Sequence, residues 1–192
     1  MPPWGPTTTS EEVAQALAPE IHGKTILITG ATLGGLGAQA ALALSHHAPK
    51  LLILAGRSLS KSQATADAIR AAAPSVPIRL LELDLASQAQ IRSAAAEVNA
   101  YAEPIDVLIN NAGIMAAPYA RTVDGLEAQF ATNHVGPFLF TNLVMGRVLA
   151  AGRGARVVNV TSSGHAMEGI RWEDYGFEVG GSGYPGSGMV RN

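Results

Sequence analysis

The stretch Thr29-Gly30-Ala31-Thr32-Leu33-Gly34-Gly35-Leu36-Gly37 decides the fold of this 192-residue chain. The residues before it, 24–28, are mostly apolar or β-branched and predict a buried strand. The residues after it, 38–44, are alanine, glutamine and leucine only, which favours a helix. Glycines between a strand and a helix let the backbone approach a phosphate, and the free N–H groups at the helix start attract the anion. The stretch therefore predicts a site for a dinucleotide pyrophosphate, with Gly30, Gly35, Leu36 and Gly37 as its contacts.

The composition is typical of an α/β domain whose strands are covered on both faces. Hydrophobic residues make up 47% of the chain, charged residues make up 15%, and 21 residues are glycine. The net charge is −2 and the 13 Lys and Arg residues are scattered, so no nucleic-acid partner is expected. The chain has no cysteine, which excludes disulfides, thiolate catalysis and thiolate metal sites.

The sequence shows no targeting signal and no membrane span. Residues 1–9 contain no cationic segment followed by an apolar core, which argues against a signal peptide. No apolar run approaches the roughly 20 residues that are needed to span a bilayer. A cytoplasmic protein is therefore the default expectation. The histidines lack metal-ligand spacing with carboxylates, so no metal site is expected; they are His22, His46, His47, His134 and His165.

Strand-like and helix-like segments alternate from residue 24 onward. Strands are predicted at 24–29, 51–55, 78–83, 105–109 and 156–160. Helices are predicted at about 36–47, 60–73, 87–101 and 124–151. The last is expected to break near Gly136-Pro137, because proline lacks the backbone N–H that a helix interior needs. This alternation predicts an α/β fold of the Rossmann type, a doubly wound parallel sheet of about five strands with right-handed crossovers. Its ligand is expected at the carboxyl ends of the strands.

The pattern divides the chain into three regions. Residues 1–22 are an N-terminal extension, expected to be disordered up to residue 9 and then to form a short helix. Ser10-Glu11-Glu12 can cap this helix and Pro19 limits it. Residues 23–175 are expected to form the NAD(P)-binding Rossmann domain, and residues 176–192 are expected to be an irregular glycine-rich tail.

The end of the second predicted strand indicates which dinucleotide is bound. The glycine loop is not of the Walker A type, because Leu36-Gly37 stands where Lys-Ser/Thr is required. Arg57 follows the strand, and no acid is present there to accept a ribose hydroxyl. A guanidinium fork suits a 2′-phosphate, so NADP is expected rather than NAD. A solvated arginine is the alternative interpretation of Arg57.

The ends of the third and fourth predicted strands carry further candidates. Asp84, which precedes Leu85, can accept a hydrogen bond from an adenine amino group or cap the helix that starts near Ser87. Asn110-Asn111-Ala112-Gly113 follows the fourth strand, and its small residues would let the backbone approach the ribose and the nicotinamide. If the backbone approaches the cofactor in this way, Asn111 and Gly113 contact it. Alternatively, the two amides tie neighbouring strand ends together.

Together these residues resemble the short-chain dehydrogenase/reductase family, and within it the retinol-dehydrogenase-like and WW-domain-oxidoreductase-like branch. The resemblance runs from about residue 24 to residue 175. Five motifs in the family's order carry it, at residues 29–37, 84–85, 110–113, 132–138 and 156–163. The glycine loop departs from the family's pattern by one extra residue, which alters the turn. The resemblance implies hydride transfer between a nicotinamide cofactor and an alcohol or carbonyl of a small, lipophilic molecule.

The resemblance also implies a catalytic set of Asn, Ser, Tyr and Lys. Asn133 matches the asparagine that holds a proton-relay water, and an amide bonded to neighbouring backbone is the alternative. Ser162 matches the serine that polarises the substrate oxygen, with Ser163 as second choice and a plain loop serine as the alternative. Tyrosine and lysine should follow as Tyr-x-x-x-Lys. Tyr184 is the nearest match, but glycine stands at the lysine position and no lysine occurs after Lys61.

The chain is therefore expected to be a C-terminally truncated member with little or no turnover. The alternative is a catalytically inactive dinucleotide-binding module that associates with an intact relative. Without the following helix, Phe138, Phe140, Leu143 and Val144 are expected to lie partly in water. The fifth strand is expected to be an unprotected edge. Formation of a homo- or hetero-oligomer through the 124–151 helix would cover this face.

Overall fold

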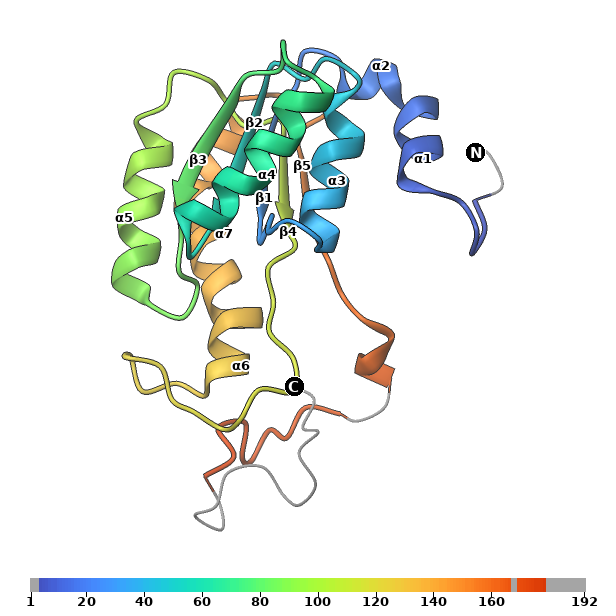
Figure 1. The fold of residues 1–192 in the computed structure, drawn as a ribbon. Coiled ribbons are helices and arrows are strands. Elements are labelled where there is room, and N and C mark those ends of the chain that lie inside the picture. Colours follow the sequence, from blue (N-terminus) through green and yellow to red (C-terminus); the bar gives the residue numbers. More distant parts are fainter. Residues whose placement is uncertain (1–3, 167–168, 179–192) are drawn as a thin grey trace.

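The computed structural model describes residues 4–166 and 169–178, which fold around one parallel sheet (Figure 1). The sheet has five strands in the order β3-β2-β1-β4-β5, and each neighbouring pair is parallel. The strands are β1 (Thr25–Thr29), β2 (Leu51–Gly56), β3 (Ile78–Glu82), β4 (Val107–Asn110) and β5 (Arg156–Asn159). The predicted doubly wound fold is confirmed, and so is the edge position of the fifth strand.

Helices cover the sheet from both sides. One face carries α3 (Leu36–Ser45) and α4 (Leu59–Ala72), and the other carries α5 (Gln88–Asn99) and α7 (Gly136–Leu149) (Figure 1). The shorter elements are α1 (Ser10–Ala16), α2 (Ala18–Ile21), α6 (Ala128–Phe130), the π-helix η1 (Ala131–Val135) and the 3₁₀-helix η2 (Ser163–Ala166). Every residue of β1 is buried, because β1 is a central strand with a hydrophobic cluster on each face.

The region predicted as a helix at 124–151 differs from that prediction in two ways. Helical structure begins at α6, four residues later than predicted, because Glu127 caps α6 by accepting hydrogen bonds from Gln129 N and Phe130 N. The predicted break near Gly136-Pro137 takes the form of a change of helix type, since the π-helix η1 ends at Val135 and α7 begins at Gly136. The wide turn of η1 leads directly into α7, and Pro137 lies in the first turn of α7, where its missing N–H is tolerated.

The N-terminal extension is more ordered than predicted over the residues that the structure describes. Residues 1–3 lie outside them, but Thr8 Oγ1 accepts a hydrogen bond from Gly5 N at 2.9 Å. The predicted cap at Ser10 is wrong. Thr9 is the N-cap of α1 and forms a reciprocal capping box with Glu12, because its position puts Glu12 three residues into the helix. Two apolar side chains of α1 and α2, Ala14 and Ile21, reach the hydrophobic cluster on the α3 side of the sheet.

The apolar side chains of α7 are divided between core and solvent. Phe138 is 65% exposed, as predicted. The prediction for Phe140 and Val144 is wrong, since both are fully buried in the cluster that includes Ile91 and Val98 of α5. Packing of α5 against α7 supplies the cover that the sequence was expected to lack.

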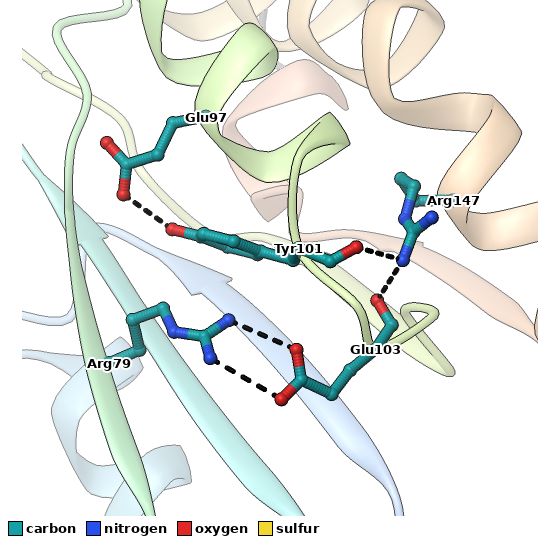
Figure 2. A network of polar contacts seen from close by, with 5 residues as sticks. All are labelled: Arg79, Glu97, Tyr101, Glu103 and Arg147. Atoms are coloured by element: carbon teal, nitrogen blue, oxygen red, sulfur yellow. Dashed lines mark hydrogen bonds and ion pairs between the residues drawn. The ribbon is translucent and has the colours of Figure 1, made fainter.

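A polar network fixes the loop between α5 and β4 (Figure 2). Arg79 of β3 pairs with Glu103 at 3.3 Å, and its guanidinium lies 4.1 Å from the ring centre of Tyr101. Tyr101 donates to Glu97 at 2.6 Å, and Arg147 of α7 donates to the backbone oxygens of Tyr101 and Glu103. Burial, followed by the hydrogen bond to Glu97, raises the pKa of Tyr101, so its hydroxyl stays a donor at neutral pH. The network secures the loop at the amino ends of β3 and β4, opposite to the strand ends that carry the glycine loop.

The contrast between two phenylalanines of α7 makes the cover by α5 testable. Phe140→Ala should lower the free energy of unfolding by about 3–5 kcal/mol, because a fully buried ring leaves a cavity. Phe138→Ala is the matched control and should change it by less than about 0.5 kcal/mol. Urea unfolding followed by circular dichroism measures both, with Phe140→Leu as a milder variant. Equal effects at the two positions would contradict the packing of α5 on α7.

Candidate functional site

The glycine loop joins β1 to α3 in a conformation that favours glycine. Gly30 has φ +71° and Gly34 has φ +84°, and Gly35 N donates to Thr32 O at 2.9 Å to close the turn. Gly35 is the N-cap of α3 and brings no side chain to cap the helix. A hollow of about 630 Å³ borders the loop; it is lined by Leu33, Gly34, Gly35, Leu36, Ala38, Gln39 and Leu42. The free N–H groups at the uncapped start of α3 suit an anionic group.

Two glycines of the loop are required by close packing against the end of β4. A Cβ at Gly30 would lie 2.7 Å from Ala112 Cα. A Cβ at Gly37 would lie 2.8 Å from Gly30 O and would also overlap Asn111 Nδ2. The absence of side chains at Gly30 and Gly37 therefore lets the loop, α3 and the end of β4 meet at one place.

Asn111 and Thr29 hold this junction together. Asn111 Nδ2 donates to Thr29 O at 2.9 Å and to Gly30 O at 3.2 Å. In the other direction, Thr29 Oγ1 accepts from Asn111 N and Ala112 N at 3.1 and 3.0 Å. Sequence reasoning missed Thr29. The available signal was a hydroxyl at the last position of a buried strand, which needs polar partners.

Asn110 ties β4 to its other neighbours. Its Nδ2 donates to Thr141 Oγ1 of α7 and to Asn159 Oδ1 of β5, both at 2.9 Å. The structural interpretation of the two amides, as ties between strand ends, is therefore confirmed. Gly113 follows at the carboxyl edge, where a Cβ would lie 3.3 Å from Asn133 Oδ1.

Asn133 lies within the π-helix η1 and pairs with the chain that follows β4. Its Nδ2 donates to Ile114 O and its Oδ1 accepts from Ile114 N, both at 2.8 Å. Bonding to neighbouring backbone, the alternative for this residue, is therefore observed, although the backbone is that of another segment. π-helical turns occur often at functional sites. Here the turn sets Asn133 against the segment that leaves the carboxyl edge of the sheet.

Ser162 lies beyond β5, near the same edge. Val160 N donates to Asn110 O at 2.9 Å, which keeps the chain beside β4 for one residue past the strand. Ser162 is exposed, and its Oγ accepts from Gly164 N at 3.1 Å. Ser163 is also exposed and begins η2. Tyr184 lies outside the residues that the structure describes.

The strand ends on the β2 and β3 side carry Arg57, Asp84 and Leu85. Arg57 is exposed, and its side chain has no hydrogen bond or ion pair with any residue that the structure describes. Asp84 Oδ1 accepts from Ala86 N at 2.9 Å, while Ser87 caps α5. The helix-cap interpretation of Asp84 is therefore wrong, because its carboxylate closes a turn before the helix.

Leu85 is buried beneath the start of α7. A Cβ at Gly136 would lie 2.9 Å from Leu85 Cβ and would overlap its carbonyl oxygen. This contact brings the segment after β3 against the π-helix that carries Asn133. Apart from Tyr184, the predicted residues thus gather at the carboxyl ends of β1 to β5.

The order of these motifs along the sheet edge agrees with one known family. Residues 24–177 match the family described as short chain dehydrogenase. The chain belongs to this family. It is 39% identical over 172 residues to oxidoreductase fscI from Fusarium equiseti, a match that covers 88% of this chain and 67% of that protein. It is 40% identical over 159 residues to human retinol dehydrogenase 13, covering 83% of this chain and 47% of the relative.

A solved short-chain dehydrogenase has the same fold. The enzyme from Sphingobium yanoikuyae, described in complex with NADPH, is 26% identical and matches with a TM-score of 0.64. The match covers 80% of this chain and 59% of that one. This short-chain dehydrogenase thus spans between about half and two thirds of the length of these proteins. Among the residues that the structure describes, no helix is both long and apolar enough to cross a bilayer.

Adding the same methyl group at two glycines should have opposite effects in this short-chain dehydrogenase. Gly37→Ala should lower the free energy of unfolding by about 1–3 kcal/mol. The added Cβ would overlap Gly30 O and the side-chain amide of Asn111, which is held in place by its own hydrogen bonds. Gly146→Ala, on the open face of α7, should raise it by about 0.5–1 kcal/mol, because nothing lies within 4 Å and alanine favours the helix. Thermal and urea unfolding measure both. A neutral Gly37→Ala would contradict the close packing of the loop on Asn111.

Proposed function

We propose that this chain binds NADP across the carboxyl edge of its sheet. We also propose that the chain is of the oxidoreductase type that transfers hydride to or from an alcohol or carbonyl of a small, lipophilic molecule. The observation that carries the proposal is the junction at the start of α3. Two glycines without room for a Cβ hold the loop against Ala112 and Asn111, and the start of α3 has no side-chain cap beside the exposed Leu36. The positive end of a helix and its free N–H groups stabilise a pyrophosphate there.

The proposed contacts follow the order of the strand ends. Gly30, Gly35, Leu36 and Gly37 surround the pyrophosphate. Asp84 and Leu85 lie toward the adenine, and Asn111 and Gly113 toward the ribose and nicotinamide. Because Asn111 Nδ2 is already occupied by two backbone oxygens, its contribution to the cofactor is to hold the loop in place.

Arg57 is proposed to select NADP over NAD. It follows β2 directly, and no described carboxylate pairs with its guanidinium. A free guanidinium at this strand end can form paired charged hydrogen bonds with a 2′-phosphate. The Sphingobium yanoikuyae enzyme, a related protein solved in complex with NADPH, supports this choice.

Ser162 and Asn133 are the proposed catalytic residues of the chain. The Ser162 hydroxyl accepts one hydrogen bond from Gly164 N, so its hydrogen is free to donate to a substrate oxygen. Both atoms of the Asn133 amide are bonded to the backbone of Ile114, so the proposed part of Asn133 in the reaction is to position the segment that follows β4. Bound NADPH would supply the hydride. The proton donor is left unassigned in this proposal, because no lysine of the 192 residues follows Lys61 to complete a Tyr-x-x-x-Lys pair.

The lack of that lysine favours a second candidate function, a dinucleotide-binding module without turnover that associates with an intact relative. The two candidates predict the same cofactor site. They differ in the rate of reduction, which a kinetic assay separates.

Charge reversal at Arg57 tests the cofactor choice. Arg57→Glu should weaken NADPH binding about 10- to 100-fold, since charged hydrogen bonds contribute about 1.5–3 kcal/mol. NADH affinity should change by less than about twofold, because NADH has no 2′-phosphate. Isothermal titration calorimetry with both cofactors measures this, and Arg92→Glu on α5 is the control for an exposed arginine elsewhere. Equal losses for NADPH and NADH would remove Arg57 from the 2′-phosphate site.

Turnover of the 192-residue chain is expected to be close to background. NADPH oxidation with a panel of aliphatic and aromatic aldehydes and ketones measures it. An intact relative, human retinol dehydrogenase 13, serves as the control for assay conditions. Robust turnover by this chain would contradict the expectation that a Tyr-x-x-x-Lys pair is needed.

A further inference from the structure

Helix α1 packs beside α3, the helix that follows the glycine loop (Figure 1). Ala14 of α1 is buried and belongs to the same hydrophobic cluster as Ala41 and Ala43 of α3. Ile21 of α2 is a second buried anchor in that cluster. We call residues 10–21, which form α1 and α2, the N-terminal segment. Buried apolar side chains therefore fix the N-terminal segment to the body of the fold.

A polar contact joins the start of α1 to the start of α3. Gln39 lies near the start of α3, and its Nε2 donates to Glu11 Oε1 at 2.6 Å and to Ser10 Oγ at 3.2 Å. The backbone N–H of Gln39 donates to Gly35 O at 3.1 Å, and Gly35 is the N-cap of α3. Gln39 thus connects α1 with the turn that ends the glycine loop.

Glu11 is held in a position to accept this hydrogen bond. Thr9 and Glu12 form a capping box that fixes the start of α1. Ser10 Oγ donates to Glu11 Oε2 at 3.1 Å, which leaves Oε1 for Gln39. Hydrogen bonds from its own backbone and from Ser10 lower the pKa of Glu11, so the carboxylate is charged at neutral pH. A charged acceptor strengthens the bond from Gln39.

The start of α3 depends on neighbouring segments for its conformation. Gly35 brings no capping side chain, no acidic residue lies in the first turn, and glycine at position 37 disfavours a helix. Residues 32–36 are all exposed. Gly37 packs against Asn111, whereas Gln39, two residues further on, faces another way and is held by α1. The first turn is therefore held between the end of β4 and the N-terminal segment.

We propose that Gln39 is a positioning residue for the dinucleotide site. Through Glu11 and Ser10 it ties the first turn of α3 to α1, which keeps the free N–H groups of the helix start in place for a pyrophosphate. This inference rests on the proposed cofactor site, and it gives the N-terminal segment a part in that site. Because NADPH and NADH share the pyrophosphate, loss of the tie weakens both equally, unlike a change at Arg57.

Isothermal titration calorimetry on the 192-residue chain tests this coupling. Gln39→Ala should weaken NADPH and NADH binding alike, by about 3- to 10-fold, as expected for the loss of one hydrogen bond to a charged group in solvent. Gln63→Ala is the matched control, because Gln63 Nε2 donates to Asp67 Oδ1 at 2.7 Å within α4. It should change both affinities by less than about twofold.

Two variants of Glu11 separate positioning from a general loss of stability. Glu11→Ala should weaken both cofactors as much as Gln39→Ala, and the double variant should weaken them no further, because either change breaks the same bond. Losses that only reflect weaker helices would add instead. Glu11→Gln keeps an acceptor oxygen for Gln39 and should restore both affinities to within about twofold of the unaltered chain.

Three results would overturn the proposal. They are binding losses no larger than that of Gln63→Ala, losses that add in the double variant, and a loss confined to NADPH. If the unaltered chain binds no dinucleotide, the proposed function fails, and hydrogen exchange then tests the tie itself. Glu11→Ala should speed exchange of the Gln39 amide, which is bonded to Gly35 O, by about threefold or more. An unchanged exchange rate would reject the tie as well.

Discussion

The junction between the ends of β1 and β4 is the constraint on which the rest of the site depends. Asn111 donates to the two backbone oxygens of Thr29 and Gly30, and the Thr29 hydroxyl accepts from two backbone N–H groups after β4. The contact is so close that Gly30 and Gly37 have no room for a Cβ. If the two strand ends moved apart, the start of α3 and the segment that leads to Asn133 would move with them.

From this junction, hydrogen bonds extend across the sheet edge. Asn110 reaches Thr141 of α7 and Asn159 of β5, so a single strand end connects both neighbours. Asn133 then holds the segment after β4 by pairing with Ile114. Such buried or half-buried polar groups are stable only when their partners are in place, which makes the edge a rigid platform. The amino ends of the strands, on the opposite side of the sheet from this platform, are secured separately by the network around Tyr101 and Arg147.

The described part of the fold is unevenly covered, and this bears on the proposed site. The cofactor edge rests on the buried strand β1, which pairs with β2 on one side and β4 on the other. In contrast, β5 is an edge strand with mostly exposed residues. The proposed dinucleotide site therefore rests on the well-packed part of the described fold.

Much of the architecture follows from local sequence, because it depends on periodicity and on glycine. Apolar β-branched runs separated by helix-forming runs predict five parallel strands, and the loop from Thr29 to Gly37 predicts the dinucleotide edge. Local chemistry also predicts that Arg57, Asp84 and Asn111 follow strand ends. These predictions concern neighbours in sequence, which is why they could be made without a structure.

Contacts between distant segments required the tertiary structure. The π-turn at Asn133, the burial of Phe140 by α5 and the turn closed by Asp84 each contradict or refine a local expectation. Each depends on which surface packs against the segment, and a periodic pattern contains no information on that. The sequence by itself therefore determined the family and the order of its motifs along the chain. Only the tertiary structure decided which side chains hold the site and which apolar surface remains open, because those depend on three-dimensional packing between segments up to about 80 residues apart.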